Sequence, residues 1–307
     1  MATFASVTDG SAPKFYVTTL KIAAIDIGSN AARLQISSVL TDNGVVSFKK
    51  VEYVRFPLRL GHDVFTYGYL TPESEDRTTR LMECYKLLME LHEVQGYMAC
   101  ATSAMRESSN GADVVARILK KTGIKIQIID GTKEAQLINN VVVLALGKEQ
   151  FLHVDVGGGS TELNLYFDHQ KIASKSFKIG SVRLLEGKET RGAWKKMQDW
   201  VEDNMNPNEP IIAVGTGGNI SKLFNLVAKT SDTTTSLTEL KRMRNYIASF
   251  SLEDRIHRLR LNADRADVII PAADIYIAAM EWSGAESIIV PDLGLKDGIL
   301  KLVYEGL

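Results

Sequence analysis

Residues His153–Tyr166 read HVDVGGGSTELNLY, and this stretch decides the fold. Apolar and polar residues alternate on both sides of a glycine run, which is the pattern of two β-strands joined by a turn. The run consists of Gly157, Gly158 and Gly159, followed by Ser160. Such a segment is either a tight β-hairpin or a loop whose free backbone N–H groups bind a phosphate. The residues by themselves leave both interpretations open.

The same pattern occurs 129 residues earlier, in AIDIGSNAARLQI, which begins at Ala24. An ungapped alignment places Asp26 on Asp155 and Arg33 on Glu162. A repeat at this distance indicates two similar domains rather than a solenoid, whose repeats are about 20–50 residues long. Two facing domains leave a cleft between them, which is a common place for a ligand.

Glycine turns recur outside the opening stretch. In the earlier copy the turn is Gly28, Ser29 and Asn30, and a third turn, Gly215, Thr216, Gly217 and Gly218, lies between a strand pattern and a helix pattern. Free N–H groups at a helix start bind anions, so the third turn is either a phosphate site or a plain strand-to-helix connection. The chain has no GxxxxGK[ST], so it is not a P-loop nucleoside triphosphatase, and it has no GxGxxG, so the dinucleotide-binding fingerprint is absent.

Strand and helix patterns alternate along the chain. Strand patterns start at Lys21, and helical patterns cover residues 71–96, 110–123 and 133–147. Thr71 is the expected N-cap of the first helix and Gly96 its expected end. This alternation predicts an α/β fold.

Composition narrows the function classes. A chain of 307 residues fits two domains, and 45% apolar with 24% charged residues is typical of a globular protein. A net charge of −1 argues against a protein that coats nucleic acid. Cys84 and Cys100 have no metal-ligand spacing, and no apolar run reaches the length of a membrane span. We therefore expect reduced thiols, a cytoplasmic location, no membrane partner and a loose extension over residues 1–20.

Carboxylates at the ends of buried strands predict a cation site. Asp26 and Asp155 each end a strand before a glycine turn, and Glu162 follows Asp155 closely. A buried carboxylate is costly without a cation or N–H donors, and carboxylates near a phosphate require a cation between them. We therefore predict Asp155 and Glu162 as metal ligands, with Asp26 a weaker one. Alternatively, both aspartates only cap their own turns.

For three other charged residues the sequence gives a weaker indication of a role in the site. Glu134 lies in the first turn of a predicted helix whose N-cap is expected at Thr132, and its ordinary role would be to favour the helix dipole. Arg106 follows a strand, and Arg33 lies in the first glycine repeat. Either arginine could bind phosphate oxygens or simply face solvent.

Seven segments, in order, resemble the exopolyphosphatase / guanosine pentaphosphate phosphohydrolase family. They are AAIDIGSNAARLQI, ATSAMRESSN, IIDGTKEAQLI, VDVGGGSTELNL, IGSVRLLE, VGTGGNI and the stretch from ADVIIPAADIYI to PDLGLKDGIL. The resemblance extends from Lys21 to the C-terminus. That family belongs to the superfamily of actin, sugar kinases and heat-shock chaperone ATPases. The resemblance therefore implies two ribonuclease-H-like lobes, here residues 21–131 with 292–307 and residues 132–291, around an interlobe cleft.

The resemblance also implies chemistry and site residues. It implies Mg²⁺-dependent release of a terminal phosphate from polyphosphate or from guanosine pentaphosphate, in a homodimer. Glu134 corresponds to the glutamate proposed as the base for the attacking water, and Asp155 and Glu162 to metal- and phosphate-positioning groups. Arg106 matches a family arginine, and the glycine turns Gly157–Ser160 and Gly215–Gly218 match the phosphate cradle.

The chain departs from the family pattern at particular places. Lys133 stands where many relatives have a glutamate, which leaves one carboxylate and adds a cation. Long relatives carry a further helical C-terminal module that helps to hold long chains, and because the sequence ends just after the last matching motif, we expect no such module and no processive action on long polyphosphate. On the resemblance as a whole, exopolyphosphatase activity is the main hypothesis. The alternatives are guanosine pentaphosphate hydrolysis, a low-turnover polyphosphate or nucleotide sensor, and a kinase of the same superfamily.

Overall fold

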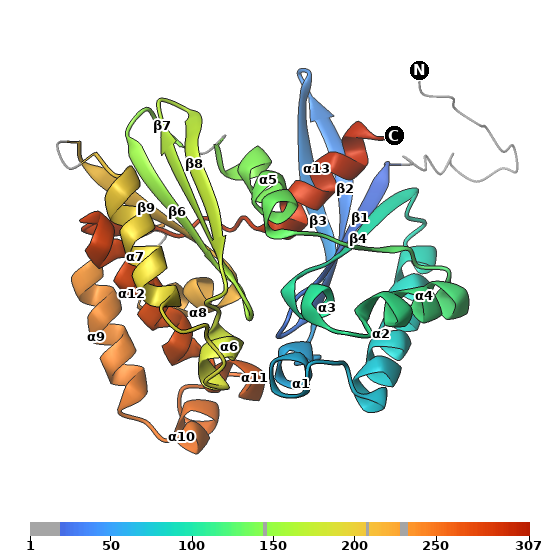
Figure 1. The fold of residues 1–307 in the computed structure, drawn as a ribbon. Helices are drawn as coiled ribbons and strands as arrows, with labels where there is room; N and C mark the ends of the chain where they lie inside the picture. The colour runs from blue at the N-terminus through green and yellow to red at the C-terminus, as the bar shows by residue number, and fades with distance from the viewer. Residues whose placement is uncertain (1–18, 144–145, 207–208, 228–232) are drawn as a thin grey trace, which may run out of the picture.

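The computed structural model describes residues 19–143, 146–206, 209–227 and 233–307. Most of the extension predicted at residues 1–20 lies outside the described residues. The described residues form two mixed β-sheets with helices around them, arranged as two lobes (Figure 1). This arrangement confirms the predicted α/β class with two lobes.

The first lobe is built on a five-stranded sheet in the order β3-β2-β1-β4-β5. Its strands are β1 (Lys21–Ile27), β2 (Ala32–Asp42), β3 (Val45–Phe56), β4 (Gly96–Ala101) and β5 (Ile126–Ile128). Its helices are α1 (Leu60–Tyr67), α2 (Pro72–Leu91), α3 (Ser103–Glu107) and α4 (Gly111–Thr122).

The second lobe is built on a six-stranded sheet in the order β10-β11-β9-β6-β7-β8. Its strands are β6 (Gln150–Val156), β7 (Thr161–Phe167), β8 (Gln170–Phe177), β9 (Ile211–Thr216), β10 (Thr234–Ser236) and β11 (Ser287–Ile289). Its helices are α6 (Ser181–Leu185), α7 (Ala193–Asn204), α8 (Gly218–Val227), α9 (Leu237–Ala248), α10 (Leu252–His257), α11 (Ala263–Ala266) and α12 (Ile269–Ser283).

The two sheets repeat one topology. In each lobe the first two hairpins are antiparallel, and the first strand then pairs in parallel with a later strand, β4 in one lobe and β9 in the other. Strands β1 and β6 both have seven residues, and β6 begins 129 residues after β1. The repeat seen in the sequence is therefore a repeat of the fold.

Two helices lie between the sheets. Helix α5 (Gly131–Val142) and helix α13 (Leu295–Glu305) pack against each other and against faces of both sheets (Figure 1). Their apolar residues share a core with Ile22 and Ala24 of β1 and with Phe151 and Val214 of the second sheet. The sheet faces that carry Asp26 and Asp155 are therefore turned toward this shared layer.

Side-chain caps set the starts of several helices, among them α2, α5, α9 and α10. The Thr71 side chain accepts a hydrogen bond from the Ser74 backbone N–H, as the predicted N-cap of α2 should. Two details of the prediction were wrong. Asp130, not Thr132, caps α5, because its side chain accepts from the Lys133 N–H. Gly96 begins β4, because α2 already ends at Leu91.

In the parts of the chain that the structure describes, no helix is long and apolar enough to cross a bilayer.

Candidate functional site

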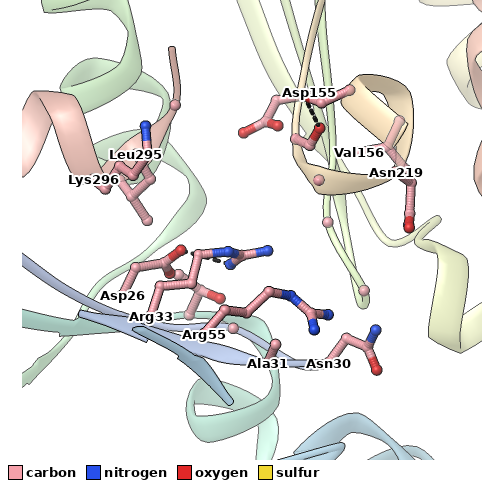
Figure 2. Close-up of a pocket in the computed structure, with 18 of the residues that line it drawn as sticks. Asp26, Asn30, Ala31, Arg33, Arg55, Asp155, Val156, Asn219, Leu295 and Lys296 are labelled. Carbon is pink, nitrogen blue, oxygen red and sulfur yellow. Dashed lines mark hydrogen bonds and ion pairs between the residues drawn. The ribbon is translucent and has the colours of Figure 1, made fainter. Parts of the chain in front are cut away.

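A cavity of about 260 Å³ lies between the lobes, where the glycine turns meet (Figure 2). Both sheets contribute to its wall, and so does the segment that leads into α13. The predicted site residues that line it are Asp26, Gly28, Ser29, Asn30, Arg33, Glu134, Asp155, Gly157, Gly158, Ser160, Gly217 and Gly218. The structure thus brings together residues that are almost two hundred positions apart in the chain.

The first two glycine turns are built alike. Gly28 N–H donates to the Ala31 carbonyl at 3.1 Å, and Gly157 N–H donates to the Ser160 carbonyl at 2.9 Å. Each turn therefore closes on itself within a hairpin, so the hairpin interpretation of the sequence is correct. Because the turns also face the cavity, the hairpin and the ligand-loop interpretations are compatible.

The two hairpins differ in charge at equivalent positions. Asp26 lies opposite Arg33 in the first hairpin, and an Arg33 Nη1 to Asp26 Oδ2 distance of 2.8 Å makes them an ion pair. Asp155 lies opposite Glu162 in the second hairpin. One Asp therefore has a cation beside it, and the other has a second carboxylate.

Burial and mutual repulsion raise the pKa values of the second lobe's carboxyls. Burial, and after it the charge of the nearby Asp155, raises the pKa of Glu162 to about 7. Burial raises the pKa of Asp155 to about 6. Burial also raises the pKa of Glu134 well above its usual value, and Glu162, Asp155 and Asp26 raise it further. The second lobe's carboxyls and Glu134 therefore lie close enough together for the charge on one to raise the pKa of the next.

Glu134 lies in the first turn of α5 and is 8% exposed. Its Oε2 atom is buried and has no hydrogen-bond partner. Arg106 Nη1 lies 4.0 Å from that oxygen, but it donates to the Ile129 carbonyl at 2.6 Å. Arg106 therefore lies behind Glu134, outside the cavity lining. Its positive charge lowers the pKa of Glu134, but by less than burial and the neighbouring carboxyls raise it.

Gly158 and Gly159 bring the lobes into contact. A Cβ atom on Gly158 would lie 2.8 Å from the Ser29 Cβ, and one on Gly159 would lie 2.5 Å from Phe65 Cζ. Arg183 holds this turn, because its Nε donates to the Gly159 carbonyl at 2.8 Å and its guanidinium lies over the Phe65 ring. Two of the three glycines are thus explained by close packing between lobes.

The third turn follows β9. Gly217 has a φ of 109°, a left-handed conformation that favours glycine, and Gly218 begins α8. The Tyr276 hydroxyl of α12 donates to the Thr216 carbonyl and accepts from the Val156 N–H, so it joins β9 to β6 beneath the turn. A Cβ on Gly218 would lie 3.2 Å from Arg265 Nη2 and 3.5 Å from Arg33 Nη2. Two guanidinium groups therefore flank the start of this helix.

Basic side chains predominate along the wall. Among the described lining residues six are basic and four are acidic, and the basic ones are Arg33, Lys50, Arg55, Lys222, Arg265 and Lys296. Burial lowers the pKa of Arg265, and the nearby Arg55 and Arg33 lower it further. Guanidinium groups that repel one another favour an anionic ligand between them. Figure 2 shows Arg33 and Arg55 side by side in the cavity.

Five predicted site residues do not line the cavity: Gly159, Gly215, Thr216, Arg106 and Glu162. Gly215 lies within β9, where a Cβ would meet Ile288 of β11 at 2.8 Å, so packing explains it. Glu162 lies behind Asp155 and accepts a hydrogen bond from Ser176 at 2.8 Å. Lys133, the expected extra cation, is also absent from the lining.

Sequence reasoning missed much of the basic wall. Lys50, Tyr53 and Arg55 come from β3, and no spacing in the sequence marks them as site residues. Lys296 and Arg265 lie in or next to segments that carry the family resemblance, and that position was the available signal. Arg55 reaches the cavity because β3 pairs with β2, which places Arg55 beside Arg33.

Ion pairs join the lobes at the edge of the cavity. Arg55 pairs with Asp264 of α11, and Arg59 Nη2 lies 2.7 Å from Asp267 Oδ2. Asn30 Nδ2 also donates to the Asp264 carbonyl at 2.8 Å. The short helix α11 is therefore fixed to the first lobe through polar contacts.

Comparisons with known proteins identify relatives of this chain. A family model described as the Ppx/GppA phosphatase family matches residues 39–304. A bifunctional 3-dehydroquinate synthase/phosphatase of Fusobacterium nucleatum is 29% identical over 92% of this chain, but the chain spans only 46% of that protein. Exopolyphosphatase 1 of Mycobacterium leprae is 22% identical over 92% of this chain and 88% of its own length.

Solved structures show the same fold. An exopolyphosphatase from Cytophaga hutchinsonii superposes with a TM-score of 0.80 at 24% identity, covering 94% of this chain and 98% of that one. The Ppx/GppA family member of Aquifex aeolicus superposes with a TM-score of 0.72 at 25% identity, again covering 94% and 98%.

Proposed function

Because the chain belongs to the Ppx/GppA phosphatase family, we propose that it hydrolyses the terminal phosphoanhydride bond of inorganic polyphosphate. The observation that carries the proposal is the placement of Glu134. Its carboxylate is buried at the cavity wall, lacks a hydrogen-bond partner on Oε2, and has a raised pKa. A buried carboxylate that its surroundings make more basic suits a general base.

In the proposed reaction, Glu134 accepts a proton from a water molecule as the water oxygen attacks the terminal phosphorus. The bond from that phosphorus to the bridging oxygen breaks, and the shortened chain leaves with the bridging oxygen. The N–H groups of the glycine turns and the guanidinium groups of Arg33, Arg55 and Arg265 would bind the phosphate oxygens. The basic excess of the cavity supports an extended polyanion as the substrate.

A divalent cation such as Mg²⁺ fits the residues present. Neighbouring buried carboxyls have raised pKa values, and one buried carboxylate oxygen has no partner, so a cation would relieve both conditions. Among the described residues no three His, Cys, Asp or Glu side chains form a ligand group, and Mg²⁺ commonly takes one or two carboxylates with substrate phosphates. Asp155 and Glu162 would hold it, whereas Arg33 already neutralises Asp26. The cation would neutralise charge on the phosphate as it is transferred.

Guanosine pentaphosphate is the second candidate substrate. Tyr53 is the single aromatic side chain among the described lining residues, and the residue is 38% exposed. It offers one face on which a base could stack. A Tyr53→Ala substitution should therefore impair only hydrolysis of the guanosine nucleotide.

The test is phosphate release from medium-chain polyphosphate and from guanosine pentaphosphate, each with Mg²⁺ and with a chelator. We expect Mg²⁺-dependent release from polyphosphate, with the nucleotide as the poorer substrate. Tight Mg²⁺-dependent binding of polyphosphate without release would identify a sensor instead and would refute the proposal. ATP consumption that requires a sugar or acid acceptor would identify a kinase.

A further inference from the structure

A row of buried polar side chains crosses the second sheet behind the cavity. Ser174 Oγ lies 2.7 Å from Asn164 Oδ1, Asn164 Nδ2 lies 3.0 Å from His153 Nδ1, and His153 Nε2 lies 2.9 Å from Thr216 Oγ1. The side chains of Asn164, His153 and Thr216 are fully buried. The row ends at Asp155, the cross-strand neighbour of Thr216. Buried polar groups at core positions of strands are costly, so this row requires an explanation.

The chemistry of the row gives it a direction. The Asn164 Oδ1 atom accepts from the Ser174 hydroxyl, so the Asn164 amide donates to His153 Nδ1. An accepting Nδ1 atom carries no proton, so the imidazole is neutral and its one N–H is on Nε2. The His153 side chain is also fully buried, and burial favours the neutral ring. The Nε2–H group must then donate to the Thr216 hydroxyl oxygen.

This direction determines what Thr216 does. Since its oxygen accepts from His153, its own proton is free to point elsewhere. Asp155 lies directly beside Thr216 on the adjacent parallel strand, so its carboxylate is the acceptor placed for that proton. In the opposite direction Thr216 would donate to His153 and present only lone pairs to a carboxylate, which is repulsive.

The first lobe shows why the second one has this row. The position equivalent to His153 is Ala24, and the residue beside Asp26 on the neighbouring parallel strand is Cys100. Ala24 has no polar side-chain atom to form such a row, and the cation beside Asp26 is Arg33. In the second lobe Glu162 takes the place of that arginine. Asp155 thus lacks a cation across the hairpin and has a hydroxyl donor from the adjacent strand instead.

We propose that His153 is a positioning residue for phosphate hydrolysis: its Nε2–H group orients the Thr216 hydroxyl toward Asp155 and so fixes that carboxylate for the cation and phosphate in the cavity. The inference rests on the proposed function, because Asp155 matters to catalysis only there. His153 lies behind Asp155, is not part of the cavity lining, and acts through Thr216.

Paired substitutions test the inference. His153→Gln places an amide donor near the Nε2 position and should keep the bond to Thr216, whereas His153→Asn is too short to do so. We expect His153→Asn and Thr216→Val each to lower kcat by about 10–100-fold, the range for residues that orient a metal ligand, with KM for polyphosphate nearly unchanged. His153→Gln and Thr216→Ser should retain most of kcat. His169→Asn, at an exposed turn, is the control.

The decisive measurement is a double-mutant cycle. If His153 acts through Thr216, His153→Asn lowers kcat no further in a Thr216→Val background, whereas independent effects multiply. Multiplying effects, or wild-type kcat in Thr216→Val, would overturn the inference. Mg²⁺ affinity of each variant, measured by calorimetry, should show the same non-additivity without any turnover.

The imidazole tautomer provides a test that needs no variant. Nitrogen NMR of the wild-type protein should show His153 protonated on Nε2, and protonation on Nδ1 would overturn the inference. If the wild-type protein releases no phosphate at all, the proposed function fails. The His153 tautomer and the double-mutant cycle on Mg²⁺ affinity then still test the hydrogen-bond row. If phosphate is released but the cycle is additive, the inference alone fails.

Discussion

Glu134 is the residue whose surroundings most clearly favour chemistry over structure. A glutamate in a first helical turn normally serves the helix dipole from an exposed position, as Glu73 does in α2. Glu134 has the same helical position but is buried beside other carboxyls at a cavity wall. Its surroundings, not its place in the helix, set its properties.

Glu134→Gln should therefore lower the single-turnover rate of phosphate release by about 10²–10⁴-fold, the usual contribution of a general base. Binding of polyphosphate should persist, because the amide keeps the shape of the side chain. Glu73→Gln is the matched control, since it changes a first-turn glutamate outside the cavity. A fully active Glu134→Gln variant would remove Glu134 from the mechanism.

The pKa of Glu162 predicts how stability depends on pH. Because the folded-state values of about 7 for Glu162 and about 6 for Asp155 exceed the ordinary values, the folded protein binds more protons than the unfolded chain between about pH 4 and pH 7. The free energy of unfolding of the metal-free protein should thus fall as pH rises through that window. Glu162→Gln should flatten this fall and make the variant more stable than wild type at pH 8, by about 1–3 kcal/mol.

Denaturant unfolding in chelator at pH 5 and pH 8 measures this effect. Glu73→Gln should keep the wild-type dependence on pH. Added Mg²⁺ should stabilise the wild-type protein at pH 8 more than Glu162→Gln, because the carboxylates then have their cation. Equal pH slopes in wild type and Glu162→Gln would contradict the burial argument.

At the scale of elements, the turns are the functional units. The β1–β2 and β6–β7 turns have the same internal hydrogen bond, and they touch each other where Gly158 meets Ser29 and Asn30. Ser29 Oγ also lies 2.9 Å from Ser103 Oγ at the start of α3. The turns are therefore parts of one packed junction, and the cavity takes its shape from it.

Gly158→Ala tests the junction. The added Cβ would lie 2.8 Å from Ser29 Cβ and 3.3 Å from the Asn30 nitrogen, so the two turns must separate. We expect a loss of stability of about 1–3 kcal/mol from overpacking, and a loss of kcat/KM of about 10²-fold because reacting groups on opposite lobes are displaced.

Gly306→Ala is the control, because its new Cβ would have Leu302 O as its nearest atom, at an ordinary 3.5 Å. Stability and turnover of that variant should match wild type within error. Wild-type turnover in Gly158→Ala would mean that close contact of the turns is unnecessary.

At the scale of the whole molecule, charge pairs hold the lobes in register around the cavity. Arg55 and Arg59 of the first lobe pair with Asp264 and Asp267, which belong to α11 and the residue after it. Asp264 is 6% exposed, and Arg55 is crowded by Arg265, so Asp264 offsets more than one positive charge. Catalytic geometry across the cleft depends on such pairs.

Asp264→Asn should therefore lower the free energy of unfolding by about 3 kcal/mol, because it leaves buried guanidinium groups without their carboxylate. Inorganic phosphate should restore part of this loss, since an anion in the cavity can take the place of the missing charge. Thermal and urea unfolding with and without phosphate measure both effects.

Asp274→Asn is the control. Asp274 pairs with Arg244 within the second lobe at 2.7 Å and is 40% exposed, so its loss should cost about 0–1 kcal/mol with no response to phosphate. Equal losses in Asp264→Asn and Asp274→Asn would show that the interlobe pair has no special role.

The sequence by itself determined the repeat, the α/β class and the two lobes. Period-two alternation around Asp26 and Asp155 depends on neighbouring residues only, so it could be read directly, as could the Thr71 cap of α2. The family resemblance added Glu134, and the structure places Glu134 and both aspartates at one cavity.

Only the tertiary structure decided which of these residues lie together and which side chains surround each of them. Arg106 lies behind Glu134, and Gly158 serves lobe contact, because packing between segments distant in sequence fixes both. The basic wall from β3 and the buried row from His153 to Asp155 likewise arise from strand pairing across the fold. A local pattern records which face of a strand is buried, but the partner of a buried polar group is set by register and lobe closure, which the pattern does not contain.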